Sequence, residues 1–155
     1  MLVLVLGVGN RTRGDDGAGP CIAEQVAALA LPGVEVVVEA EPLALIEIMA
    51  GHDVVVLVDA VAPQGDAGRV HVWDGDSLPR GRAMRAVGSH GMGVRDALEL
   101  AGALHSLPSR LTVVGVEGES FDVGAPLSEA VRGSLGEAVQ AVRDAVHRHL
   151  LWPTH

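Results

Sequence analysis

Apolar residues along this chain follow two alternating patterns. An unbroken aliphatic run at Leu2–Leu6 and the run Val54–Ala60, which is aliphatic except for Asp59, predict strands buried on both faces, as in a parallel sheet. A β-branched run at Val34–Glu39 and an aliphatic run at Leu111–Val116 predict two further strands. The alternation of polar and apolar residues in Arg69–Trp73 is typical of an edge strand. The chain therefore contains five candidate strands.

Helical spacing of apolar residues separates most of these runs. It predicts a first helix over 17–30, a short one that starts at Pro42 and stops at Gly51, and a third over 94–104. The apolar positions of Val131–Val146 predict a long final helix, whereas Asp74–Ser89 has no period and reads as a long loop. We expect one domain spanning 1–155, an α/β fold arranged as a three-layer α/β/α sandwich.

The composition and charge of the chain exclude several classes of function. The formal net charge of −9 argues against nucleic acid as a partner, since phosphate binding requires a basic surface. A single cysteine, Cys21, excludes an internal disulfide, and the absence of lysine excludes a P-loop or a Schiff base. The first apolar run is too short to span a bilayer and no basic segment precedes it, so we expect a cytoplasmic protein without membrane insertion.

Three residues form the candidate site. Asp16 follows the first strand, Asp59 ends the run at Val54–Ala60, and His90 lies where the long loop meets the third helix. Right-handed crossovers bring all three to the carboxyl edge of the sheet, where α/β proteins bind ligands. Two carboxylates and an imidazole suit nickel, iron, manganese or zinc, and three ligands leave coordination positions open.

These residues and motifs also have simpler structural explanations or other functional ones. Asp15 is expected to cap the first helix, so that Asp15→Asn costs at most about 1 kcal/mol. His90 alone would pass for an exposed loop histidine, and we expect the other six histidines to be solvated. Gly7-Val8-Gly9 begins like a dinucleotide-binding fingerprint, but Thr12 replaces its third glycine and the acidic pair would repel a pyrophosphate.

The same motifs, in order along nearly the whole chain, resemble those of the hydrogenase maturation endopeptidases. The matching segments are Gly7–Asn10, Gly14–Pro20, Leu57–Ala60, Ser89–Met92, Val114–Glu117, Ser120–Phe121, Gly124 and Leu127–Ser128. One departure is Glu117-Gly118, where several members carry Gln-Pro. The family's sheet is mixed, so the resemblance implies a mostly parallel five-stranded sheet with one antiparallel strand, for which Arg69–Trp73 is the candidate.

The resemblance implies a peptidase that removes a C-terminal extension from the large-subunit precursor of a [NiFe] hydrogenase once nickel is in place. Asp16, Asp59 and His90 match the family's catalytic, nickel-recognising residues, with nickel carried by the substrate and other divalent ions able to substitute. We expect the free protein to be a monomer. Two alternatives remain: a metal-binding or metal-sensing module without activity, and a conventional zinc metallopeptidase.

Overall fold

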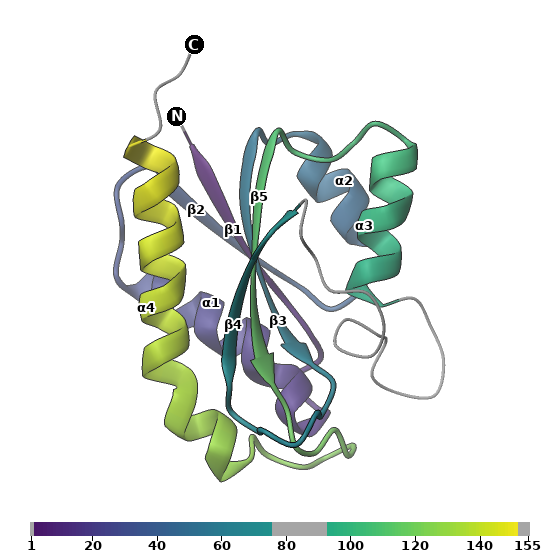
Figure 1. The fold of residues 1–155 in the computed structure, drawn as a ribbon, viewed down its shortest axis with the longest axis vertical. Coiled ribbons are helices and arrows are strands. Elements are labelled where there is room, and N and C mark those ends of the chain that lie inside the picture. Colours follow the sequence, from purple (N-terminus) through teal and green to yellow (C-terminus); the bar gives the residue numbers. More distant parts are fainter. Residues whose placement is uncertain (1, 76–92, 152–155) are drawn as a thin grey trace.

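The computed structural model describes residues 2–75 and 93–151 as alternating strands and helices (Figure 1). Its strands are β1 (Val3–Val8), β2 (Val34–Glu39), β3 (Val54–Val61), β4 (Val70–Asp74) and β5 (Arg110–Glu117). Its helices are the 3₁₀ turn η1 (Gly14–Gly17), α1 (Ala18–Ala28), α2 (Ala44–Ala50), α3 (Val94–Ala103) and α4 (Glu129–Leu151).

The five strands form one sheet in the order β2-β1-β3-β5-β4. The first three pairings along this order are parallel and β4 runs antiparallel to β5, which confirms the predicted mixed sheet. β1 and β3 lie at its centre, and every residue of β1 is buried. Their aliphatic composition follows from this position, because both faces of a central strand are covered.

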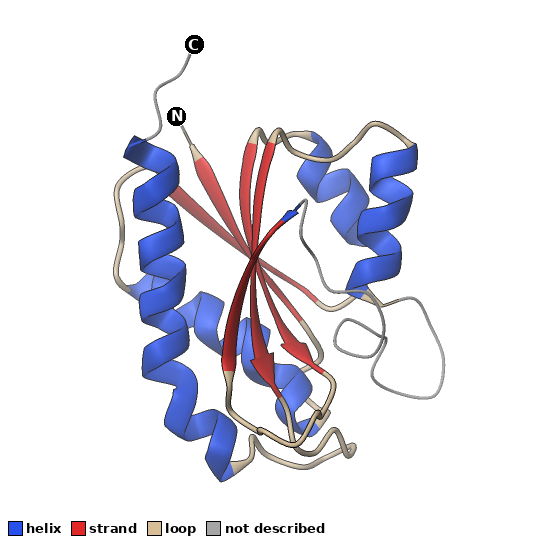
Figure 2. Cartoon of the chain, viewed as in Figure 1, coloured by secondary structure: helices blue, strands red, loops and turns tan. Residues whose placement is uncertain are grey.

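Helices cover the sheet on both sides (Figure 2). α1 and α4 pack on one face over side chains such as Val5 and Val56, and α2 and α3 pack on the other over Leu6 and Leu57. Neighbouring residues of β1 and β3 thus enter opposite cores, as the two-residue period of a strand requires. This is the expected three-layer sandwich.

α1 lies directly against the central strands, which brings its amino end to the site. Gly19 makes this contact possible: a Cβ there would meet the carbonyl oxygen of Val8 and would lie 2.6 Å from that of Val58. Gly9, at φ 148°, turns the chain at the end of β1 in a conformation that side chains disfavour. The loop between β1 and α1 is therefore held at the carboxyl ends of both β1 and β3.

The first two predicted helices have different bounds in the structure. The segment predicted as one helix over 17–30 begins with Gly17, the last residue of η1, and continues as α1, which ends at Ala28. α2 begins at Ala44 because Pro42 and Leu43 form a turn, in which the Leu45 amide donates to the Pro42 carbonyl at 3.1 Å.

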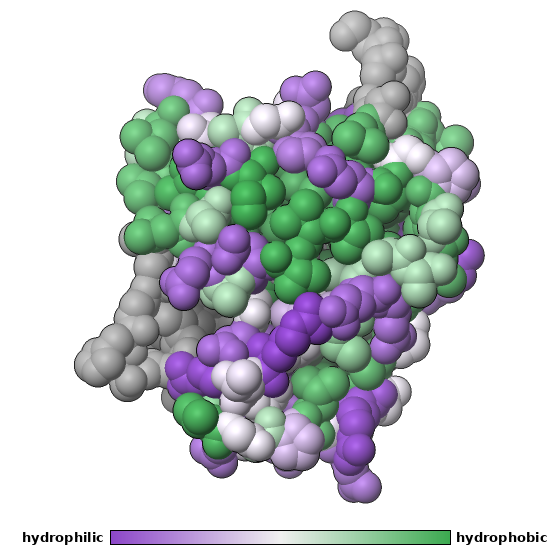
Figure 3. All heavy atoms as spheres, turned by 180° about the vertical axis from the view of Figure 1, so that it is seen from behind, coloured by the Kyte–Doolittle hydropathy of each residue, from purple (hydrophilic) through white to green (hydrophobic). Residues whose placement is uncertain are grey.

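The view from behind shows apolar side chains gathered over one broad area, with hydrophilic residues below it (Figure 3). β2 is an edge strand, and all four of its valines remain partly exposed. Glu35 and Glu39 place negative charge on this strand, which disfavours pairing with another chain. Within the described residues, no helix is long and apolar enough to cross a bilayer.

Candidate functional site

The first candidate residue, Asp16, belongs to η1 in the β1–α1 loop. Its Oδ2 accepts a hydrogen bond from the Asn10 amide at 2.8 Å, and its own amide donates to the Arg13 carbonyl at 3.1 Å. The Asn10 side chain accepts from both the amide and the hydroxyl of Thr12, which shapes the turn before Asp16. Asp16 is half-buried, and one oxygen of its carboxylate is thus oriented by its own loop.

The second candidate, Asp59, is the only residue of β3 that keeps partial exposure. It pairs in register with Gly115 of β5, which pairs in turn with His71 of β4. Paired positions of neighbouring strands face the same side, so Asp59 projects toward the α2–α3 side with Leu57 and Val61. Asp59 is therefore a partly exposed acid at the end of an otherwise buried strand, where a ligand can reach it.

The two carboxylates interact electrostatically. Burial raises the pKa of Asp59 well above its usual value, and the nearby charge of Asp16 raises it further, against a hydrogen bond from the Ala60 amide. Burial also raises the pKa of Asp16, against the Asn10 hydrogen bond and the charge of Arg13. Two acids destabilised in their charged forms by burial favour a bound proton or a cation. The structure thus brings together two of the three predicted residues.

His90, the third predicted residue, lies outside the described residues, and its role stays a prediction. Among residues 2–75 and 93–151, no group of three His, Cys, Asp or Glu side chains is placed to hold a metal ion. A divalent ion between Asp16 and Asp59 would thus need a further ligand from elsewhere. Carboxylate oxygens with one nitrogen donor fit borderline divalent metals.

The prediction for Asp15 is wrong. Its side chain makes no capping bond to η1 or α1 and is fully buried. It accepts hydrogen bonds from three backbone amides of a distant segment: Oδ2 from Glu119 at 2.8 Å and Ser120 at 3.1 Å, and Oδ1 from Ser128 at 2.7 Å. Nothing in the local pattern signals this role, since its partners lie more than one hundred positions away.

Three histidines expected to be solvated are partly buried: His52, His71 and His149. His71 stacks on Trp73 with ring centroids 4.9 Å apart. Its buried Nε2 has no hydrogen-bond partner among the described residues and lies 4.0 Å from Glu117 Oε1. Burial, together with the charge of Arg69, lowers the pKa of His71. His149 Nε2 lies 2.9 Å from the Thr112 hydroxyl, and burial lowers its pKa as well.

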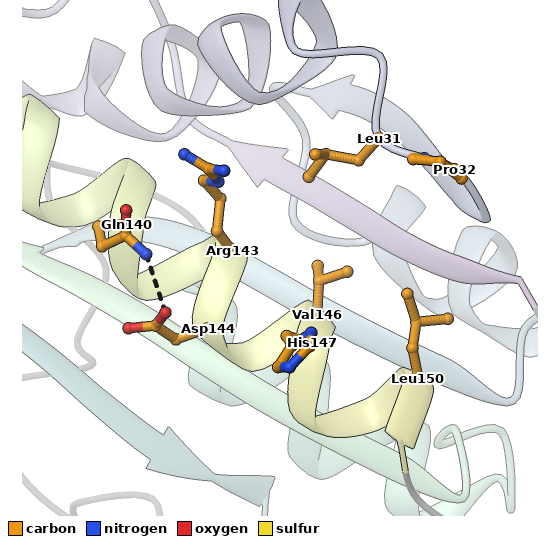
Figure 4. Close-up of a pocket in the computed structure, with 8 residues that line it drawn as sticks. All are labelled: Leu31, Pro32, Gln140, Arg143, Asp144, Val146, His147 and Leu150. Atoms are coloured by element: carbon orange, nitrogen blue, oxygen red, sulfur yellow. Dashed lines mark hydrogen bonds between the residues drawn. The ribbon is translucent and has the colours of Figure 1, made fainter.

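A pocket of about 310 Å³ lies away from this site, at the amino end of β2 (Figure 4). Leu31 and Pro32 face Val146 and Leu150 of α4 across it. Its polar lining comes from four residues of α4: Gln140, Arg143, Asp144 and His147. Since the acids of the candidate site lie at the opposite, carboxyl ends of the strands, the pocket does not belong to that site.

The fold and the acid pair define a class of three-layer α/β/α proteins with two acids at the carboxyl edge of a mixed sheet. The hydrogenase maturating endopeptidase HybD from E. coli superposes with a TM-score of 0.75 at 23% identity, covering 96% of this chain and 94% of that one. The [NiFe] hydrogenase maturation protease HybD from Thermococcus kodakarensis superposes with a TM-score of 0.69 at 26% identity, covering 93% and 98%.

Sequence comparison defines the family. The family model for hydrogenase maturation proteases matches residues 23–145, and the chain belongs to this family. The hydrogenase expression/formation protein HupD of Rhizobium leguminosarum bv. viciae is 29% identical over 146 residues, which cover 91% of this chain and 72% of HupD. HupD of Rhodobacter capsulatus is also 29% identical, over 92% and 70%. The chain is therefore an enzyme, a peptidase of hydrogenase maturation.

Proposed function

We propose that this enzyme removes the C-terminal extension of a [NiFe]-hydrogenase large-subunit precursor after nickel has been inserted. In this proposal Asp16, Asp59 and His90 recognise the nickel that the precursor carries. The observation that supports it most directly is the acid pair: two partly buried carboxylates, close enough to repel each other, at the edge of the sheet where α/β proteins bind ligands.

Binding a divalent cation would relieve the repulsion between these acids. In the free enzyme, burial and the charge of Asp16 both destabilise the ionised form of Asp59. A metal ion would use both carboxylates as ligands and so offset this destabilisation. Nitrogen from His90 would complete an O,O,N set with open positions, to which nickel held by the precursor can be added. The site thus suits a metal that arrives already bound to another protein.

This arrangement would make nickel a checkpoint for cleavage. Three ligands hold a metal less firmly than the closed four-ligand sites of structural zinc, so the free enzyme should remain essentially metal-free. The ion then serves to seat the precursor's completed centre. Cleavage would follow only when the metal is present, and generic peptides would not be substrates.

The central experiment compares nickel-loaded and nickel-free precursor as substrates of the purified enzyme. Mass spectrometry of the products should show loss of a C-terminal peptide only from the loaded form. Asp16→Asn, Asp59→Asn and His90→Ala should each abolish processing with an unchanged circular dichroism spectrum, since each removes one donor of the set. A folded Asp59→Asn variant that processes at the wild-type rate would refute the site.

A second measurement addresses the origin of the metal. Elemental analysis of enzyme purified without chelator should give far less than one metal per chain, and a casein assay with added nickel or zinc should show no hydrolysis. Stoichiometric zinc with chelator-sensitive casein hydrolysis would instead identify a conventional zinc metallopeptidase.

A further inference from the structure

Two loops distant in sequence form one unit at the carboxyl edge of the sheet. The first is the β1–η1 loop that leads to Asp16, and the second is the segment 118–128, which connects β5 to α4. Backbone hydrogen bonds join them at Gly124 N to Thr12 O (2.6 Å) and at Gly14 N to Ala125 O (3.1 Å). The contact is close, because a Cβ at Gly14 would lie 2.5 Å from the Ser120 carbonyl oxygen.

The Asp15 carboxylate lies at the centre of this unit. Both of its oxygens accept hydrogen bonds from backbone amides of the second loop, and its own amide donates a hydrogen bond to the Ser120 carbonyl at 2.8 Å. The side chain has no exposed surface, and hydrogen bonds to a buried charge are among the stronger polar contacts in proteins. Asp15, which directly precedes Asp16, thus fixes the segment 118–128 to the chain next to Asp16.

Asp16 has little else to hold it. Within the described residues its side chain accepts one hydrogen bond, from the Asn10 amide, and its amide is bonded to the carbonyl of Arg13. Both contacts come from the same short loop, so they move with that loop. The link to a different part of the fold comes from Asp15, one position earlier.

We propose that Asp15 is a positioning residue for the metal-recognising acid: it locks the segment 118–128 against the β1–η1 loop and so sets where the Asp16 carboxylate lies. This inference rests on the proposed role of Asp16. Asp15 itself is not available to a ligand, because its carboxylate accepts hydrogen bonds from three backbone amides. Its effect on the reaction therefore passes through Asp16, whose placement determines the geometry of the metal site.

The test compares Asp15→Asn with Val142→Ala, a control that removes two methyl groups from a fully buried side chain of α4 away from the acids. The Asn10 amide, hydrogen-bonded to Asp16, reports the position of that carboxylate in ¹⁵N–¹H NMR spectra. Titration with nickel(II) chloride alone then measures paramagnetic broadening of this signal. Processing of nickel-loaded precursor, with kcat separated from KM, completes the comparison.

In Asp15→Asn we expect the Asn10 signal to shift, the nickel concentration for half-broadening to rise at least tenfold, and kcat to fall at least tenfold. Val142→Ala should match the wild type in all three. If Asp15→Asn does not fold, Glu119→Pro removes one amide donor while keeping the carboxylate, and should change the same readouts in the same direction.

An Asn10 signal and a nickel midpoint in Asp15→Asn equal to those of Val142→Ala would overturn the inference, leaving Asp15 a purely stabilising residue. A wild-type enzyme that neither responds to nickel nor processes precursor would instead refute the proposed function. The Asn10 signal would then still decide whether Asp15 positions Asp16.

Discussion

Asp15 and Asp16 are adjacent acids for which the same substitution should have opposite effects on stability. Asp15 is fully buried and accepts hydrogen bonds from three backbone amides, and these hydrogen bonds stabilise the fold. Asp16 is half-buried beside Asp59, and its raised pKa means that its charge destabilises the fold at neutral pH. We therefore expect Asp15→Asn to unfold more easily than the wild type and Asp16→Asn less easily.

The expected loss in Asp15→Asn follows from its hydrogen bonds. Asparagine offers one acceptor oxygen, which can retain the Glu119 and Ser120 amides, while its NH₂ group faces the donor of Ser128. Losing one bond to a charged group costs about 1.5–3 kcal/mol, and the unsatisfied buried amide adds about 1–3 kcal/mol. Together these contributions give an expected loss of about 2.5–6 kcal/mol, a large share of the about 5–15 kcal/mol that stabilises a typical domain.

Urea unfolding at pH 7, followed by circular dichroism, measures both variants against the wild type. A loss of this size corresponds to a fall in Tm of roughly 10 °C for a chain of this length. If Asp15 merely capped a helix, asparagine would replace it almost without cost, since the two cap equally well. A loss below about 1 kcal/mol in Asp15→Asn would therefore refute the assignment of its hydrogen bonds.

Three further predictions concern other parts of the fold. Asp59→Asn should abolish processing yet stabilise the protein at pH 7. Because the folded-state pKa of Asp59 is raised, its free energy of unfolding in urea should exceed that of the wild type by a margin that grows as the pH rises above about 4. Gly19→Ala should cost about 1–3 kcal/mol and reduce processing, since its Cβ would force α1 off β1 and β3, whereas Gly136→Ala in α4, with open space around it, should not destabilise. His71→Phe should keep the stacking on Trp73. As the pH falls below about 6.5, the variant should lose less stability than the wild type, because the buried wild-type imidazole, whose pKa is lowered, must take up a proton there. Thermal unfolding at several pH values tests the last two, and equal pH profiles for His71→Phe and the wild type would contradict the third.

The order of strands and helices could be predicted from the sequence because it depends on local patterns. Aliphatic runs such as Val54–Ala60 have one stable solution, a strand covered on both faces, and periodic residues such as Val131–Val146 require a helix with one buried side. Asp59 could be singled out on the same grounds, since an acid closing such a run requires compensation. The antiparallel strand followed from family resemblance, and the pairing of β4 with β5 confirms it.

The roles of neighbouring polar residues were decided by the tertiary structure. Asp15 and Asp16 are chemically identical and adjacent in sequence, yet one binds the segment 118–128 and the other lies beside Asp59. The sequence likewise predicts His71 at the surface, whereas the pairing of β4 with β5 places it beside Glu117. Hydrophobic period is a property of a few consecutive residues, whereas the environment of a polar side chain depends on donors and charges that only folding brings near it.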